Sequence, residues 1–264
     1  MAFWRTAGVV AAILACSALT DRALAWSPAA HRAIARVAQE NLSNTAKLRV
    51  RLMLGRTAKL EDSAGWADTI IAERPETEAW HSITFPTGAQ GLDLRRDCPV
   101  GDCVTAKIRD FVGVIRLAYR EKARLIEGLR FLVDLTADLH QPLNVGKPPS
   151  ESEDEMEISL DGESMTLYDA WDTGFLADAD EEELADAIRT QLTPDNRKRW
   201  SRGHIKTWTW ETHQTALKQA YTELPGGDSN ALSPEYVERA RAVSEEQLAK
   251  AAVRLAALFN EIWP

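Results

Sequence analysis

Cysteine is scarce in this chain and acidic residues outnumber basic ones, and each feature excludes a class of protein. Of three cysteines in 264 residues, Cys98 and Cys103 have no further cysteine or histidine close by in sequence, so they cannot form a zinc knuckle. The chain has 31 Lys and Arg residues against 40 Asp and Glu, a net charge of −9. Such a surface repels polyanions. Generic basic contacts would not hold a nucleic acid, and metal cations would have to supply local positive charge.

Several motifs of nucleotide binding and hydrolysis are absent as well. The sequence contains neither a P-loop nor a dinucleotide-binding fingerprint. It also lacks the G-x-S-x-G turn that carries the nucleophile of many Ser-His-Asp hydrolases. These absences direct attention to residues that bind metals.

Apolar runs long enough to span a bilayer are missing too. Residues 1–25 instead have the pattern of a signal peptide: a basic start, a short apolar run and the cleavage site Ala23-Leu24-Ala25. We expect a mature domain of residues 26–264 that is secreted or periplasmic and has no membrane span. In an oxidising compartment, the closely spaced Cys98 and Cys103 predict a small disulfide loop.

Apolar residues recur at helical spacing over most of the remaining chain. No internal repeat and no long linker divides it. The strongest turn signal is Asp161-Gly162, which residues 158–160 and 165–167 flank as a predicted β-hairpin. We therefore predict an all-α fold, a single compact helical domain with this small hairpin. Helices are expected at 27–43, 45–72 (in short pieces), 104–119, 124–141, 180–192, 203–222 and 233–263 (with one break), and residues 80–86 are expected to be extended.

The segment from Arg124 to Asn144 is apolar on most sides, which is typical of a buried helix. Asp134 and Asp138 interrupt it four residues apart and therefore share one face. Burying two like charges is costly, and a bound cation, protonation of one acid or exposure to solvent would each relieve the cost. His140 faces away from this pair, and we expect it to be a hydrogen-bonded structural residue.

Other polar side chains interrupt apolar patterns elsewhere in the chain. With the α-amino group and carbonyl of Trp26, which cleavage would free, they form a nitrogen-and-carboxylate set suited to zinc. The side chains in this set are His31, Asp68, His81, Asp134, Asp138 and Asp172.

The order of short motifs around these residues is more specific than any one motif alone. The motifs are Trp26-x4-His31, Trp66-Ala-Asp68, Trp80-His81, Asp138-Leu-His-Gln-Pro-Leu and Trp171-Asp172. Over essentially the whole mature chain this order resembles the trinuclear-zinc, single-strand-specific nucleases and, more distantly, the bacterial zinc-dependent phospholipases C. The resemblance implies the helical fold of those proteins and a zinc-dependent hydrolase.

Three histidine positions of that family are substituted in this chain. The central His-x3-Asp-x5-His of the family is Asp134-x3-Asp138-x5-Asn144 here, and Tyr168 stands where a later histidine is expected. The resemblance assigns Asn144, Tyr168 and Asp172 to one zinc ion. Because an amide is a weak ligand and a phenol has a pKa of about 10, we expect that position to be weak or lost. We therefore expect one or two zinc ions rather than three, and the oxygen-rich set also suits manganese or magnesium.

The function implied by the resemblance is a metal-dependent endonuclease that hydrolyses phosphodiester bonds in single-stranded nucleic acid or nucleotides, with Asp68 as the catalytic base. Two departures argue for reduced activity: Ile71 replaces a basic residue close to the phosphate, and Ser82 replaces an aromatic that stacks a base. The alternative is a catalytically impaired homologue that binds metal or nucleic acid, and a phospholipase C ranks third. We expect a monomer with no stable protein partner.

Overall fold

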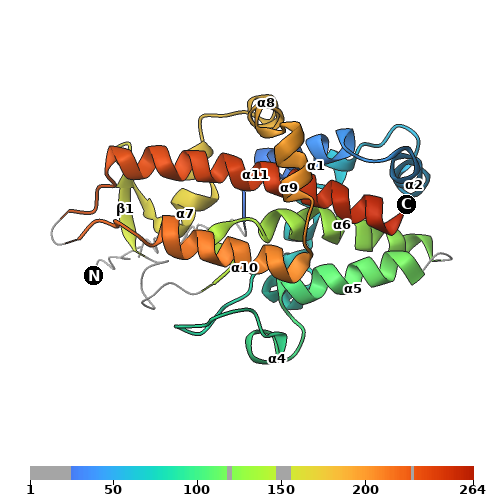
Figure 1. Ribbon diagram of the computed structural model, residues 1–264, viewed down its shortest axis with the longest axis horizontal. Coiled ribbons are helices and arrows are strands. Elements are labelled where there is room, and N and C mark those ends of the chain that lie inside the picture. The colour runs from blue at the N-terminus through green and yellow to red at the C-terminus, as the bar shows by residue number, and fades with distance from the viewer. Residues whose placement is uncertain (1–24, 118–120, 147–155, 227–228) are drawn as a thin grey trace, which may run out of the picture.

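Helix α6 (Lys122–Asp138) runs through the middle of the molecule (Figure 1). It packs against α5 (Val104–Leu117), α1 (Pro28–Glu40) and the long α11 (Pro234–Ile262). The computed structural model describes residues 25–117, 121–146, 156–226 and 229–264. The expected signal peptide therefore lies outside the described residues except for Ala25.

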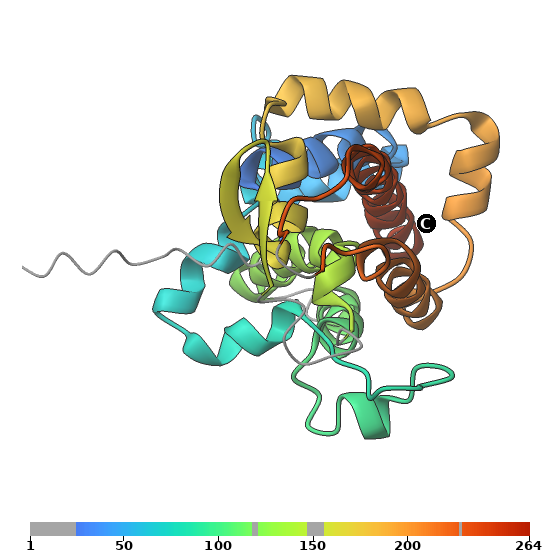
Figure 2. The same ribbon diagram turned by 90° about the vertical axis from the view of Figure 1, so that its left-hand side faces the viewer.

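The other helices surround this central group. Figure 2 shows α11 nearly end-on, with α8 crossing above it and α10 beside it. The α-helices not yet named are α2 (Asn44–Leu54), α3 (Trp66–Thr69), α4 (Leu94–Asp97), α7 (Leu167–Asp172), α8 (Glu181–Gln191), α9 (Pro194–Trp200) and α10 (Ile205–Thr215). Short 3-10 helices lie at Leu60–Ser63, Ile70–Ala72, Pro75–His81, Pro142–Asn144 and Gly174–Leu176, and a π turn extends α10 over Ala216–Ala220. The predicted helical domain is confirmed.

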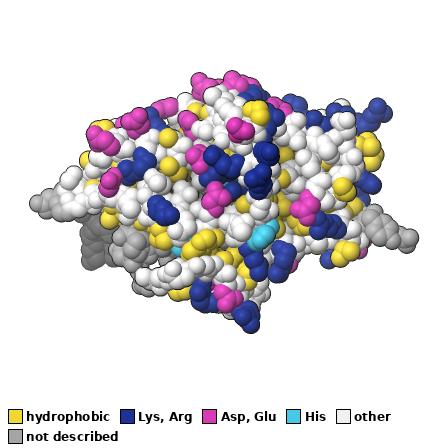
Figure 3. Space-filling view, viewed as in Figure 1, with side chains coloured by type: hydrophobic (Ala, Val, Ile, Leu, Met, Phe, Trp, Pro, Cys, Tyr) yellow, Lys and Arg dark blue, Asp and Glu magenta, His cyan; other side chains and the backbone are white. Residues whose placement is uncertain are grey.

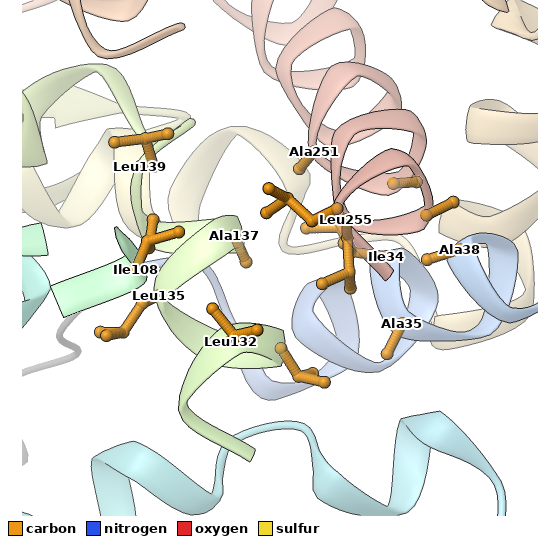
Figure 4. Close-up of a cluster of buried hydrophobic side chains, with 14 of the residues drawn as sticks. Ile34, Ala35, Ala38, Ile108, Leu132, Leu135, Ala137, Leu139, Ala251 and Leu255 are labelled. Carbon is orange, nitrogen blue, oxygen red and sulfur yellow. The ribbon is translucent and has the colours of Figure 1, made fainter. Parts of the chain in front are cut away.

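Small side chains allow the central helices to approach closely. Ala38 of α1, Ala137 of α6 and Ala251 of α11 are all buried. Leu132 and Leu255 fill the space between them (Figure 4). Such packing fixes the relative positions of α1 and α6, and this matters because both helices carry predicted metal ligands.

Helix starts agree with the sequence signals. The Ser27 hydroxyl accepts a hydrogen bond from the Ala30 amide (3.2 Å), and Pro28 opens α1. In the same way, the Ser233 hydroxyl accepts from the Tyr236 amide (3.1 Å) at the start of α11. Local capping chemistry therefore sets where both helices begin.

The predicted break in the last helix is wrong, because α11 runs without interruption from Pro234 to Ile262. The polar residues that weaken its apolar pattern are buried rather than exposed, among them Ser244, Lys250 and Arg254. Lys250 forms ion pairs with Glu211 and Glu246, at 2.7 Å each. Ion pairs with neighbouring side chains thus replace the solvent that the sequence pattern suggests for Lys250.

The hairpin is confirmed. Strands β1 (Glu157–Leu160) and β2 (Glu163–Thr166) pair antiparallel, with Leu160 opposite Glu163. Asp161 and Gly162 both adopt positive φ angles, 53° and 90°, as a type I′ turn requires. The second strand ends one residue before the predicted Leu167, because the Thr166 hydroxyl accepts from the Asp169 amide (3.0 Å) and starts α7.

Two further expectations need correction. Residues 80–86 are not one extended run: Trp80 and His81 end the 3-10 helix that Pro75 opens, and only Ile83 forms a bridge, with Val145. Residues 194–200 form α9, which the sequence analysis does not anticipate. The Thr193 hydroxyl caps it by accepting from the Asn196 amide (3.1 Å), but its apolar stripe is too short to stand out.

The expected disulfide is confirmed. Cys98 and Cys103 are bonded, with their Cα atoms 6.0 Å apart. The loop that they close joins the end of α4 to the start of α5 and lies away from α1 and the end of α6 (Figure 1).

His140 is a buried structural residue, as predicted. Its Nδ1–H donates to the Thr136 carbonyl (2.7 Å), and its Nε2 accepts from the Arg254 guanidinium (2.9 Å). Arg254 also donates to the Trp200 carbonyl (3.2 Å) and to Glu211. Burial and the charge of Arg254 lower the pKa of His140 to about 3.

This environment makes His140 a source of acid sensitivity. The unfolded chain binds a proton at His140 near pH 6.5, whereas the folded chain does so only near pH 3, so acid favours unfolding between these values. We expect the stability advantage of the wild type over His140→Gln to shrink by about 3 kcal/mol from pH 7 to pH 4. Urea unfolding at both values measures it. Parallel pH profiles for wild type and His140→Gln would contradict the assignment.

Candidate metal centre

Helix α1 brings His31 to the end of α6. The side chain is buried, with Nδ1 at 3.6 Å from Asp134 Oδ1 and Nε2 at 3.4 Å from Asp138 Oδ1. The adjoining Trp26 is also buried, and its indole N–H donates to the Ala137 carbonyl (3.1 Å). This hydrogen bond joins the indole of Trp26 to the last turn of α6.

Asp68 and His81 arrive from a segment of short helices. Gly65 adopts a left-handed conformation (φ 75°) that starts α3, and Asp68 follows within that helix. His81 Nδ1 lies 2.7 Å from Asp138 Oδ2 and 3.5 Å from Asp68 Oδ1. Main-chain hydrogen bonds hold this segment in place, because the Ile83 amide donates to the Asn144 carbonyl (2.9 Å).

The two carboxylates of α6 share a buried face, as the sequence predicts, but they have different partners. Asp138 contacts His81 through one oxygen and lies close to His31 through the other. Asp134 accepts from two backbone amides, Gly65 N–H at 2.7 Å and Ala67 N–H at 2.6 Å. Asp134 therefore anchors the start of α3, which the sequence does not reveal.

Asn144, Tyr168 and Asp172, which the resemblance assigns to one ion, are held by hydrogen bonds to one another or to Gln141. The Tyr168 hydroxyl donates to Asn144 Oδ1 (2.5 Å), and the Gln141 side-chain amide donates to Asp172 Oδ1 (3.1 Å). Gln141 Oε1 also accepts from the Asn144 amide (3.1 Å). Sequence reasoning missed the role of Gln141, although its place between Asp138 and Asn144 was a signal.

Several of these side chains carry buried polar atoms that have no hydrogen-bond partner. Buried polar groups are normally satisfied, so a cluster of exceptions indicates a missing ligand or ion. The atoms concerned are both ring nitrogens of His31, Oδ1 of Asp68, Nε2 of His81, Oδ1 of Asp138 and Oδ2 of Asp172. Asp134 is not among them, because both its oxygens accept from amides.

Imidazole nitrogen and carboxylate oxygen are ligands that zinc prefers, so the donor chemistry of these residues fits a metal ion. Among the described residues, however, no three His, Cys, Asp or Glu side chains are placed so that all three could bind one ion. The side chains instead contact one another in pairs. An ion bound here would take ring nitrogens and carboxylate oxygens of these side chains as its ligands.

Electrostatics show the cost of gathering these groups without a cation. Burial opposes the charged form of His31, but the carboxylates of Asp134, Asp138 and Asp68 outweigh it and raise the pKa of His31 to about 9. Burial raises the pKa of Asp172 to about 8 and the pKa of Asp138 well above its usual value. Burial also lowers the pKa of His81. A divalent cation would favour the deprotonated form of every one of these groups.

A helical protein in which imidazole and carboxylate groups converge at one end of a buried helix has the ligand chemistry of a metal-dependent hydrolase. The model of the S1/P1 nuclease family matches residues 26–264, and the chain belongs to that family. The resemblance inferred from the motifs is thus confirmed, as are the nuclease class and the expectation of an enzyme that hydrolyses phosphodiester bonds. The family is one of zinc-dependent nucleases.

Relatives of known name agree with this assignment. Endonuclease 2 of Arabidopsis thaliana is 27% identical over 90% of this chain and 90% of its own length. Nuclease S1 of Aspergillus oryzae is 26% identical over 96% of each chain. Nuclease P1 of Penicillium citrinum is 26% identical over 90% of this chain and 97% of its own length. The similarity therefore extends over nearly the whole of both proteins in each case.

Proposed function

We propose that this protein is an exported endonuclease that cleaves single-stranded nucleic acid with one or two bound divalent ions. The observation that carries the proposal is the cluster of buried, unsatisfied atoms on His31, Asp68, His81 and Asp138. Zinc suits the two imidazoles best, and the excess of carboxylate oxygen also suits manganese or magnesium. Once bound, such an ion would polarise the phosphate and lower the pKa of a bound water.

Asp68 is the proposed catalytic base. Its side chain is 30% exposed, whereas that of Asp138 is fully buried, so Asp68 is the carboxylate that can meet a water molecule entering from solvent. Burial raises its pKa above the usual value, which brings the carboxylate closer to the range where a general base is effective. Asp138 instead orients His81 and lies between the two imidazoles.

Asp134 receives a different role in this proposal. The sequence analysis predicts it as a ligand, but its two amide hydrogen bonds favour an anchor that holds the Gly65–Asp68 segment. Its contact with His31 adds negative charge beside that ring. We propose that Asp134 positions Asp68 and His31 rather than coordinating an ion.

A third ion is not part of the proposal. Hydrogen bonds pair Tyr168 with Asn144 and Gln141 with Asp172, so only Asp172 offers a strong ligand atom at that position. The same substitutions support the second candidate, an impaired homologue that binds metal or nucleic acid without cleaving it. The third candidate, a phospholipase C, would use the same metal ligands, and the test below separates it from the nuclease.

The direct test is metal analysis combined with an assay on single strands. We expect the processed protein to carry one or two ions per chain and to cleave a labelled single-stranded DNA faster than the matching duplex. EDTA should stop cleavage, and added zinc should restore it. Bound metal without cleavage would favour the binding protein, and hydrolysis of phosphatidylcholine in place of DNA would favour the phospholipase.

Removal of the signal peptide should matter for the metal, because only a free α-amino group at Trp26 can act as a ligand. We expect a protein that begins with one additional alanine before Trp26 to bind its ion at least ~10-fold more weakly, as loss of a ligand or its support does. Isothermal titration with zinc would measure the difference. Equal affinity in the extended protein would remove Trp26 from the ligand set.

We further propose that the protein is secreted or periplasmic and monomeric. The predicted signal peptide supports export, and the disulfide supports an oxidising compartment. No helix among the described residues is long and apolar enough to cross a membrane.

A further inference from the structure

A basic stretch stands out in this acidic chain. Residues 41–60 contain five basic side chains and no acidic one, although the whole chain has a net charge of −9. These basic residues are Lys47, Arg49, Arg51, Arg56 and Lys59. Figure 3 shows Lys and Arg side chains gathered at the end of the molecule that α2 forms, on the right of the view.

Part of this stretch lines a pocket of about 410 Å³ between the end of α1, helix α2 and the loop that follows it. Lys47, Arg51, Arg56 and Lys59 all contribute to its wall. The volume is within the range of small-molecule sites, about 300–1,000 Å³. Four cationic side chains around one pocket favour an anion as the occupant.

Most of the positive charge in the pocket is not neutralised by the protein. The single acidic lining residue, Glu40, is already paired with Arg189 (2.8 Å). Lys59 lies 3.2 Å from Glu61. Among the described residues, Arg51 and Arg56 have no acidic partner, and both are exposed. Two guanidinium groups are thus free to bind, and guanidinium forms bidentate hydrogen bonds with phosphate.

The lining also indicates what the pocket does not bind. It contains no aromatic side chain, so a nucleobase has no ring to stack on. Its apolar residues, such as Leu42 and Val50, lie buried beneath the polar wall. A phosphate group attached to a polar chain fits this chemistry, whereas a base or an acyl chain does not.

The pocket is remote from the metal centre. His31 and Glu40 lie near opposite ends of α1, and nine residues of helix correspond to about 13 Å. A stacked strand with a spacing of about 3.4 Å per nucleotide covers that distance in about four nucleotides.

We propose that the pocket formed by Lys47, Arg51, Arg56 and Lys59 is a phosphate-binding subsite for the backbone of a nucleic-acid strand, outside the cleavage site. The choice of nucleic acid as the source of the phosphate rests on the proposed function. This subsite supplies local positive charge in a chain whose net charge is negative.

Binding in EDTA tests the proposal without any need for cleavage. The probe is a fluorescent single-stranded DNA of twelve thymidines, and the variant is Arg51→Gln with Arg56→Gln, two exposed positions. We expect at least ~5-fold weaker binding at low salt, and a log–log salt slope smaller by about 1.4, since each phosphate contact on a single strand contributes about 0.7. Circular dichroism checks that the variant is folded.

The matched control is Lys198→Gln with Arg202→Gln. These residues are also exposed, belong to another basic stretch and do not line the pocket. The control should change affinity by less than ~2-fold. An equal loss in both variants would show general charge attraction, and no loss in the first would show that the pocket does not bind the strand. Either result would overturn the proposal.

Two further comparisons separate the possible sources of phosphate and the two proposals. If the pocket variant loses binding to phosphatidylserine vesicles but keeps its affinity for DNA, the phosphate belongs to a lipid headgroup and the proposal is wrong. If the wild type cleaves DNA in the presence of zinc while the pocket variant binds normally in EDTA, the subsite fails and the nuclease stands. If the wild type does not cleave but the pocket variant binds DNA more weakly, the nuclease proposal fails and the subsite proposal stands.

Discussion

Replacing Asp138 with asparagine is expected to remove both metal binding and cleavage of single-stranded DNA. Asp138 lies between the two imidazoles, with one oxygen 2.7 Å from His81 and the other 3.4 Å from His31. An amide is neutral and offers one oxygen, so it can replace neither the charge nor the second ligand atom. Because loss of a residue that merely supports a ligand costs about 10–100-fold in metal affinity, loss of Asp138 should cost at least ~100-fold.

The fold should survive this change. The pKa of Asp138 is raised by burial, which shows that its charge is costly in the folded protein, and asparagine removes that cost. We therefore expect thermal unfolding in EDTA at an unchanged or higher temperature, while bound zinc falls to a trace. The same substitution at the exposed Asp178 is the control. A fully loaded and active Asp138→Asn protein would exclude Asp138 from the metal site.

Replacing Asp134 should lower the stability of the fold, whereas replacing Asp138 should not. Asp134→Ala leaves the amides of Gly65 and Ala67 without their acceptors, so we expect the free energy of unfolding to fall by about 2–4 kcal/mol. Cleavage should fall as well, because Asp68 is the residue after Ala67 and depends on the same anchor. Urea unfolding and initial rates on single-stranded DNA measure the two effects.

Asp134→Asn separates anchoring from coordination. Its amide oxygen can still accept one of the two backbone hydrogen bonds, so about half the loss of stability should be recovered. If Asp134 is an anchor, this variant keeps its bound ion while Asp138→Asn loses it. Equal loss of metal in the two asparagine variants would return Asp134 to the ligand set that the sequence predicts.

Features that depend on local chemistry were predictable from the sequence. The starts of α1 and α11 follow from Ser-Pro caps, and the hairpin follows from Asp161-Gly162, whose positive φ angles leave few alternatives. The uninterrupted course of α11 was not predictable. Its Lys250 and Arg254 have the character of surface residues, and only the fold brings Glu211 and His140 to them.

The candidate site likewise combines features that the sequence predicts with features that only the fold reveals. The family resemblance identifies His31, Asp68, His81 and Asp138, and the structure brings them together. The anchoring role of Asp134 could not be predicted, because it depends on a left-handed turn at Gly65 that aims two amides at α6. The hydrogen bond between Tyr168 and Asn144 was equally hidden, since it joins side chains from separate segments.

The pairing of Ile83 with the segment after α6 uses main-chain atoms alone. The Ile83 amide donates to the Asn144 carbonyl (2.9 Å), and the Gly146 amide donates to the Ile83 carbonyl (2.8 Å). These two hydrogen bonds therefore do not depend on which side chain occupies position 144. A lineage can exchange the side chain at position 144 and keep both of these hydrogen bonds. The side chains offered to a ligand and the backbone framework that carries them can thus change separately.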